Sequence, residues 1–273
     1  MIPVDTPATI DATFYPAGDD TGANDGTVTV AVTRADGTTV DGIGAVSVGT
    51  EGRYTATLPA QEQMDILTAT WTGNTAKVRT IHEIVGANLV ELAEIRAQTN
   101  LTSDSIHPTA LLDDARSWFL DLVDDYCGFS PVPRFTQETV DGTGYSRVVI
   151  PNKAYVRTIR YITVDGVAVD DLAAWDLDEG ILCGPATLTK GRRNIVIGYE
   201  HGLDQAPADL RRAALTAIRA RVLADTSKQL PDRVLSQTNE FGAVQYAQAS
   251  KRYPTGLPEV DAVLARYRLP SLA

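Results

Sequence analysis

Histidine is the side chain that most often binds metals or transfers protons near neutral pH, and the chain contains three: His82, His107 and His201. None of them forms a His-x-x-x-His pair, and none lies near a cysteine in a zinc-binding spacing. The sequence therefore predicts no metal site. His201 precedes a glycine ahead of a predicted helix, and we interpret it as a turn residue whose ring hydrogen-bonds the loop backbone.

Adjacent carboxylates are the next groups that could do chemistry. They occur at Asp19-Asp20, Asp113-Asp114, Asp124-Asp125, Asp170-Asp171 and Asp176-Leu177-Asp178-Glu179. General acid–base catalysis needs two carboxyl groups held across a cleft, one of them in an apolar pocket, and sequence neighbours do not provide this. No complete calcium loop is present either. We interpret the aspartates between 113 and 125 as the wet side of a helix, and 178–180 as a hairpin turn.

Nucleophilic and phosphate-binding motifs are missing. No Gly-x-Ser-x-Gly motif frames a serine, and Gly142-Thr143-Gly144 is only a fragment of a phosphate loop. Cys127 and Cys183 have no metal-binding spacing. A disulfide between them stays open, although the pattern favours reduced, buried thiols. We therefore predict no enzymatic activity, no catalytic residue, no cofactor and no bound metal.

Arginines are concentrated on a helix that begins near Pro207. With about 100° of rotation per residue, Arg211, Arg212 and Arg219 fall within one arc of about 100°. They lie opposite most of an alanine-rich apolar stripe, which would allow close helix packing. The arginines fit two interpretations: a solvated face, or groups that pair with a neighbouring subunit or line a channel rim near DNA.

These residues need elements to position them, and residues 1–86 are predicted to be β throughout. The segment 27–33 alternates with period two and is rich in β-branched residues. Further strands are predicted at 8–15, 45–48, 53–58, 66–71 and 76–84, with turns at 18–20, 35–38, 49–52 and 72–74. This spacing predicts an immunoglobulin-like β-sandwich with Trp71 in its core, without the immunoglobulin disulfide.

The pattern becomes helical after Gly86, and residues 87–273 are predicted to form a second domain. Asn88 is expected to cap its first helix and Gly128 to end its second. Helices are expected at about 88–98, 108–127, 207–227 and 257–267. A β-rich insertion at about 131–201 has predicted strands at 145–150, 156–164, 181–188 and 194–199, with a hairpin turn at Asp165-Gly166. The segment 241–246 is strand-like.

The predicted fold class is therefore α+β: an N-terminal β-sandwich followed by a helical-bundle domain with a β-rich insertion.

Composition and charge exclude further classes. The formal net charge is -11, which disfavours a nucleic-acid binder with a basic face but is compatible with a passive, acidic DNA channel. Residues 1–86 hold 11 acidic and 4 basic side chains, whereas 87–273 hold 24 acidic and 20 basic. No apolar segment reaches membrane-spanning length and no secretory signal is recognised, so we expect a soluble protein made in a cytoplasm.

Three stretches of the second domain resemble the head-to-tail adaptor, or connector, proteins of long-tailed bacteriophages. They are the amphipathic helix at 110–126, the segment Val196-Ile197-Gly198-Tyr199-Glu200-His201-Gly202 leading into the helix at 207–224, and the ending Thr255-Gly256-Leu257-Pro258-Glu259-Val260-Asp261-Ala262-Val263-Leu264. The resemblance covers roughly residues 87–273. Its most specific motif is the Tyr-x-His-Gly turn before a Pro-x-x-Leu helix. The β-rich insertion and the sandwich depart from the minimal family pattern.

This resemblance implies a structural virion protein at the head–tail interface, made in the host cytoplasm during assembly. Such adaptors form a dodecameric ring beneath the portal, extend the DNA channel without binding DNA specifically, and support the next connector, stopper or tail-terminator protein. Their C-terminal segment commonly docks on the portal. The implied portal-contact residues here are Pro258, Val260, Val263, Leu264, Tyr267 and Leu269. The sandwich would project outward, toward the capsid or the tail collar.

Two other classes compete with this interpretation. A virion decoration or host-attachment protein would use the immunoglobulin-like domain, and exposed aromatic clusters on its loops would favour that role. Tyr15 and Trp71 alone do not make such a cluster. An enzyme with an appended sandwich would need titratable groups that converge in a pocket, and the sequence offers none.

Overall fold

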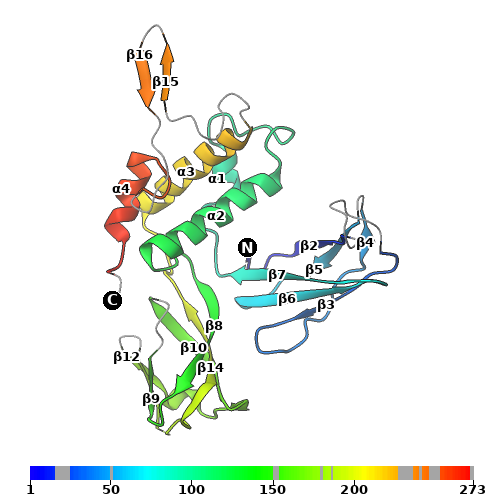
Figure 1. The fold of residues 1–273 in the computed structure, drawn as a ribbon, viewed down its shortest axis with the longest axis vertical. Coiled ribbons are helices and arrows are strands. Elements are labelled where there is room, and N and C mark those ends of the chain that lie inside the picture. Colours follow the sequence, from blue (N-terminus) through cyan, green and yellow to red (C-terminus); the bar gives the residue numbers. More distant parts are fainter. Residues whose placement is uncertain are drawn as a thin grey trace. The chain divides into compact units, whose positions relative to one another are not determined.

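The computed structural model describes residues 1–15, 25–49, 52–149, 154–178, 181–185, 187–226, 236–239, 242–245 and 253–270. The described chain is a mixed α+β protein that divides into two compact units (Figure 1). Unit 1 comprises Met1–Ala87, Pro133–Asn152 and Val156–His201, and unit 2 comprises Asn88–Val132, Lys153–Tyr155 and Gly202–Ala273. The strands of the insertion are thus grouped with the N-terminal strands, and the domain division at residue 86 stays a prediction.

The N-terminal part of unit 1 consists of two sheets around one apolar core. The strands are β1 (Ile2–Pro3), β2 (Ala8–Thr13), β3 (Thr29–Thr33), β4 (Ser47–Val48), β5 (Arg53–Leu58), β6 (Asp65–Thr72) and β7 (Lys77–Val85). One sheet has the order β1-β7-β6-β3 and the other β2-β5-β4. Strand β6 buries every second residue, so that Leu67, Ala69 and Trp71 enter the core as their period-two spacing requires. The immunoglobulin-like topology stays a prediction.

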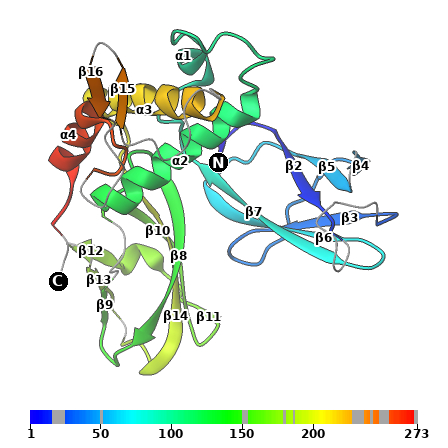
Figure 2. The same ribbon diagram turned by 45° about the horizontal axis from the view of Figure 1, so that its top comes forward.

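The later part of unit 1 is a second β-structure with its own core. Its main sheet has the order β11-β10-β14-β8, and a small sheet has the order β12-β13-β9 (Figure 2). The bounds are β8 (Arg134–Gly142), β9 (Arg147–Val149), β10 (Val156–Val164), β11 (Val167–Ala168), β12 (Asp176–Asp178), β13 (Ile181–Cys183) and β14 (Gly191–His201), with a 3-10 turn at Leu172–Ala174. The predicted hairpin turn is present, because Val164 pairs with Val167 and both Asp165 and Gly166 have positive φ.

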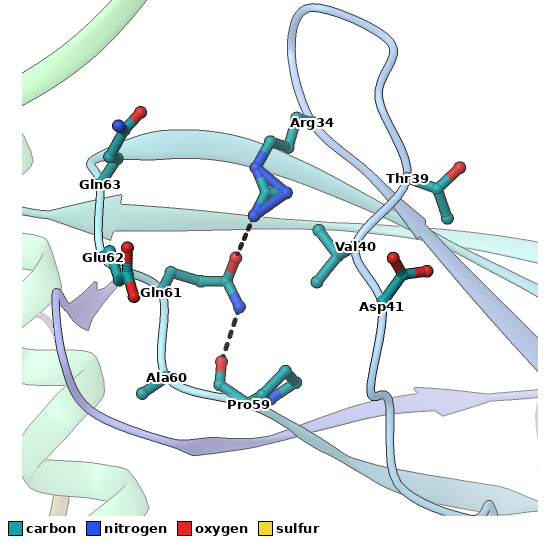
Figure 3. Close-up of a pocket in the computed structure, with 9 residues that line it drawn as sticks. All are labelled: Arg34, Thr39, Val40, Asp41, Pro59, Ala60, Gln61, Glu62 and Gln63. Carbon is teal, nitrogen blue, oxygen red and sulfur yellow. Dashed lines mark hydrogen bonds between the residues drawn. The ribbon is translucent and has the colours of Figure 1, made fainter.

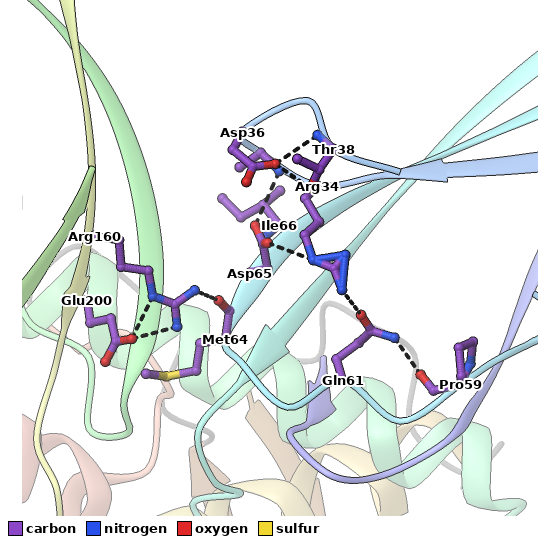
Figure 4. Close-up of polar contacts among 11 residues, drawn as sticks. Arg34, Asp36, Thr38, Pro59, Gln61, Met64, Asp65, Ile66, Arg160 and Glu200 are labelled. Carbon is purple, nitrogen blue, oxygen red and sulfur yellow. Dashed lines mark hydrogen bonds and ion pairs between the residues drawn. The ribbon is translucent and has the colours of Figure 1, made fainter. Parts of the chain in front are cut away.

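Polar contacts inside unit 1 join the N-terminal strands to β8 and β10. Arg134 on β8 forms an ion pair with Glu83 on β7 at 2.5 Å. Arg160 on β10 donates to the Met64 carbonyl and, at 2.7 Å, to Glu200 (Figure 4). Gly86 donates a backbone hydrogen bond to the Pro133 carbonyl, and a Cβ at Gly86 would come within 2.8 Å of the proline ring.

Unit 2 is helical over most of its described length. Its helices are α1 (Leu92–Arg96), α2 (Thr109–Cys127), α3 (Ala208–Thr226) and α4 (Pro258–Tyr267), and a hairpin is formed by β15 (Ser236–Asn239) and β16 (Gly242–Gln245). Helices α2, α3 and α4 contact one another, and α1 contacts α2 and α3. The buried face of α2 includes Leu112, Phe119 and Val123, as expected from its helical period. Gly128 ends α2 in the left-handed conformation, as predicted.

Several sequence predictions differ from the structure. Helix α1 begins at Leu92, not at 88, and its cap is Glu91, whose backbone N–H donates to the Glu94 carboxylate at 2.8 Å; Asn88 is not the cap. Strand β8 was not predicted. Strand β13 ends at Cys183 and not at 188, and Gly184, which follows it, lies against the Trp175 ring. The predicted turns at 18–20, 49–52 and 178–180 lie wholly or partly outside the described residues. So do the end residues 150, 227, 241 and 246 of the predicted elements 145–150, 207–227 and 241–246.

Candidate assembly interface

Helix α4 carries most of the predicted portal-contact residues, and these residues differ in how far they are buried. Val260 and Leu264 are buried inside unit 2. Val263, Tyr267 and Leu269 are half-buried, and Pro258 is exposed. The 3.6-residue period places Val260 and Leu264 on the same face of the helix, toward α2 and α3. These two residues therefore anchor α4 to its own chain.

Directional contacts hold the C-terminal end of α4. Tyr267 donates its hydroxyl to Asp209 at 2.7 Å, and Arg266 pairs with the same carboxylate at 2.9 Å. The Tyr267 hydrogen bond lowers the pKa of Asp209 below its ordinary value and raises that of Tyr267. The Leu269 N–H donates to the Cys127 carbonyl at 2.9 Å, and the Cys127 thiol lies 3.5 Å from the Leu264 carbonyl. The C-terminal end of α4 is thus bound to the start of α3 and to the end of α2.

The motif before α4 has a physical function in the structure. Thr255 donates both its N–H, at 2.9 Å, and its hydroxyl, at 2.7 Å, to one Asp261 oxygen. Its hydroxyl also accepts the Leu257 N–H at 3.1 Å. Pro258 occupies the first turn, where a missing N–H costs nothing. Thr255 and Asp261 therefore fix how the chain enters α4, which gives the Thr-Gly-Leu-Pro-Glu-Val-Asp motif a local structural cause.

The Tyr-Glu-His-Gly segment is likewise explained residue by residue. Within unit 1, the buried Tyr199 hydroxyl donates to Glu138 and His201 Nε2 lies 3.0 Å from the Thr136 hydroxyl, both on β8. Within unit 2, Gly202 has φ 99°, and a Cβ there would meet the Val132 carbonyl oxygen at 2.2 Å. Only glycine fits this conformation and this close approach.

The three predicted arginines on α3 are used differently. Arg211 pairs with Glu94 of α1 at 2.9 Å, and Arg219 donates to the Thr99 carbonyl at 3.0 Å. Arg212 is exposed, and its side chain has no hydrogen bond or ion pair with any described residue. Two of the three therefore hold the segment around α1 against α3. Only Arg212 leaves its charge available to a partner.

Arg96 is a residue that the sequence analysis missed. Its guanidinium donates to the carbonyls of Leu101 and His107 at 3.2 and 2.6 Å and pairs with Asp104 at 2.6 Å. This one side chain therefore organises the loop between α1 and α2. A lone arginine in a polar stretch gives no periodic signal by which it could have been found.

Among the described residues, no group of three or more histidine, cysteine, aspartate or glutamate side chains could hold a metal ion. His107 is buried and lines a cavity of about 580 Å³ together with Ile106 and Leu223, but no carboxylate or thiol appears among the described lining residues. Burial lowers the pKa of His82, whose ring contacts the Thr80 hydroxyl. Cys127 and Cys183 are free thiols. Within the part of the chain that the structure describes, every helix is too short or too polar to span a bilayer.

Comparison with known proteins gave structural matches alone. No family model matches the chain, and no curated protein matches it. Among solved structures, the chain is similar to a protein in the neck of a native gene transfer agent (GTA) particle with C12 symmetry, at 15% identity and a TM-score of 0.42, covering 67% of this chain and 90% of that one. A match in the neck of an empty GTA particle with C6 symmetry has 16% identity and a TM-score of 0.41, with 68% and 92% covered. A match in a native GTA virion has 14% identity and a TM-score of 0.44, with the same coverage.

Proposed function

We propose that the chain is a virion ring subunit that joins the portal to the tail-side connector and extends the DNA channel. The observation that supports this best is the way in which α4 is held. Val260 and Leu264 fix its inner face, while Pro258, Ala262 and Ala265 are exposed. A helix anchored on one face and open on the other is suited to contact a second protein without losing its own packing.

Part of the exposed face of α4, between Glu259 and Arg266, carries small side chains. Ala262 and Ala265 add little bulk, so the backbone of α4 can lie close to a partner helix or groove. With Val260 and Leu264 occupied inside the chain, portal contact falls to Pro258 and the half-buried Val263, together with these alanines. The two buried residues act indirectly, because they keep that face in place.

The distribution of charge fits a ring through which DNA slides. Cyclic closure joins two different faces of each subunit, so a ring subunit needs groups left free for a neighbour. Arg212 is such a group, whereas Arg211 and Arg219 are bound within their own chain. The net charge of -11 opposes tight phosphate binding, which would stall DNA in a channel. A ring of twelve subunits is expected from the adaptor resemblance.

The test is to mix the purified chain with the portal ring of its phage and to image the product by electron microscopy. We expect a coaxial ring at the narrow end of the portal. Deletion of residues 257–273 should abolish it, but the deletion also removes the buried Leu264. The sharper variant is therefore Ala262→Glu with Ala265→Glu, which changes exposed positions only and should weaken portal addition by roughly tenfold or more, because bulky charges would be forced into the contact.

The matched control is Ala110→Glu, the same change at an exposed position of α2, which should leave portal addition unchanged. Equal addition by the α4 variant and the control would contradict the role of α4. Failure of the wild-type chain to add to the portal, with the chain found elsewhere on the virion, would overturn the proposal in favour of decoration or host attachment.

A further inference from the structure

One end of the β8–β14 pair carries a concentration of positive charge that is unusual in so acidic a chain. Four exposed cations lie on the segments 141–147 and 187–194, which are joined at Gly142–Gly191 and at Tyr145–Leu188: Arg147, which begins β9 and pairs with Cys183, and Lys190, Arg192 and Arg193. None of them has an ion-pair partner among the described residues. Tyr145, with 72% of its surface exposed, lies in the same segments. We refer to these five residues as the basic tip.

The basic tip is held in shape by its own polar contacts. Asn194 accepts the Gly142 N–H at 2.9 Å and donates to the Thr189 carbonyl at 3.0 Å, which joins the two segments. Asp141 accepts the Arg193 N–H at 2.6 Å, and Asp165 donates its own N–H to the Asn194 carbonyl at 2.8 Å. These two carboxylates lower the net positive charge of the tip but leave it cationic. A rigid tip loses little conformational entropy when its cations bind a partner.

The N-terminal sandwich of the same chain carries a surface of opposite sign. A cavity of about 540 Å³ is lined by Thr39, Asp41, Gln61, Glu62 and Gln63 among others (Figure 3). Asp41 and Glu62 are exposed, and neither has an ion-pair partner among the described residues. We refer to this cavity as the acidic hollow.

Arg34 also lines the acidic hollow, but its guanidinium interacts with residues of its own chain. Its guanidinium donates to Gln61 at 2.9 Å and lies 3.9 Å from the Asp65 carboxylate, which balances it. Gln61 in turn donates to the Pro59 carbonyl at 2.7 Å. The outward charge of the hollow is therefore that of Asp41 and Glu62.

We propose that the basic tip of one copy of this chain binds the acidic hollow of the next copy. The two surfaces differ in position and in sign, so the contact is heterologous, and repeated contacts of this kind close a ring or extend a filament. Arginine and lysine suit carboxylates across such a contact, and Tyr145 supplies apolar area with few rotatable bonds. The inference rests on the ring proposed above and adds the surfaces that join its subunits.

A second copy fits the basic tip better than nucleic acid does. The acidic excess of residues 1–86, 11 acidic against 4 basic side chains, would repel a phosphate backbone approaching the same subunit. The same excess attracts the basic tip of a neighbour. Binding to duplex DNA is therefore the competing outcome that the experiment must detect.

The experiment uses two charge-reversed chains. One carries Lys190→Glu and Arg192→Glu in the tip, and the other carries Asp41→Arg and Glu62→Arg in the hollow. Each alone should associate with itself at least roughly tenfold more weakly than wild type in sedimentation velocity at low salt, because like charges face each other. Mixed together, the two chains should associate again, since the reversed tip of one matches the reversed hollow of the other.

The matched control carries Lys77→Glu and Arg79→Glu, two exposed cations of β7 outside both surfaces, and should associate as wild type does. No gain on mixing the two reversed chains would overturn the inference, whatever the portal experiment gives. So would loss of binding to a short DNA duplex in the tip variant without any effect on self-association. Normal portal addition by the tip variant would overturn this inference while leaving the proposed function standing; failure of the wild-type chain at the portal would reject the function instead.

Discussion

Unit 1 contains two ion pairs in which both side chains are mostly buried, beside the exposed pair Arg53–Asp11. In unit 1, the side chains of Arg134 and Glu83 are only 11% and 18% exposed, and those of Arg160 and Glu200 are 18% exposed each. In unit 2, Arg211 and Glu94 are 47% and 39% exposed. Arg134–Glu83 joins the two β-structures of unit 1, and Arg160 of the second pair also donates to the Met64 carbonyl, whereas Arg211–Glu94 joins α3 to α1 at an exposed position.

Buried and exposed ion pairs contribute differently to a fold. A mostly buried ion pair adds little net stability, because desolvation offsets the Coulomb attraction, but breaking it is costly since one charge is left without its partner. An exposed ion pair adds little to the free energy of unfolding, and breaking it costs little. We therefore infer that the two buried pairs of unit 1 help to specify how its strands are arranged, and that the exposed Arg211–Glu94 pair adds little to the stability of unit 2.

The largest effect is expected from a cavity in unit 2. Leu264→Ala removes a fully buried side chain of α4 and should lower the free energy of unfolding by about 2–5 kcal/mol. Urea denaturation followed by circular dichroism measures this, and hydrogen exchange shows where the loss occurs. A loss below about 1 kcal/mol would show that α4 contributes little to the core of unit 2.

A smaller effect is expected from breaking a pair in unit 1. Arg134→Met keeps much of the side-chain volume but leaves Glu83 without its partner, and should cost about 1–3 kcal/mol of unfolding free energy. Arg211→Met is the matched change at an exposed pair and should cost about 0.5 kcal/mol or less. Equal losses in the two variants would remove the distinction between the units.

The smallest effect concerns pH and the buried Asp65 of β6. Burial raises the pKa of this carboxyl above its ordinary value of 3.8, so the folded chain holds the proton more tightly than the unfolded chain. Its carboxylate therefore costs stability as pH rises from 3.8 through the higher folded pKa, and the full cost is present above that value.

Asp65→Asn abolishes this titration and keeps a side-chain oxygen to accept the Ile66 N–H, which Asp65 accepts at 2.7 Å. Relative to wild type, the variant should become more stable as the pH rises from about 3 to about 7, because only the wild type then carries the costly buried carboxylate. Unfolding curves at both pH values measure the difference. A constant difference would mean that Asp65 does not titrate differently in the folded and unfolded chain.

The helices and most N-terminal strands could be located from local sequence patterns, because a helical period or a period-two alternation of apolar residues is visible within a few residues. The period of Leu112, Phe119 and Val123 places α2 in this way. Strand β8 could not be predicted, because its residues from Arg134 to Gly142 are mostly charged or polar and its pairing partners on β14 lie far along the chain.

The candidate site was harder to predict than the elements. Residue types placed Val260 and Leu264 on one face of α4, but whether that face meets the same chain or a partner depends on tertiary packing that periodicity does not encode. For the same reason, Arg211 and Arg219 could not be distinguished from Arg212, since their partners Glu94 and Thr99 are more than a hundred residues away. Three cations of the basic tip stand within the run 190–193, but the contact of this segment with that of Tyr145 forms only in the folded chain.

Because Cys127 contacts α4, its reactivity can be used to measure how often α4 separates from α2. The thiol is fully buried beside the Leu264 carbonyl, and burial raises its pKa to about 11. A thiol in this state reacts slowly with alkylating reagents, because little thiolate forms and the reagent has no access. With Cys183 replaced by serine, the rate of alkylation at Cys127 would follow how often α4 lifts from α2, and would fall if a bound portal clamps the helix in place.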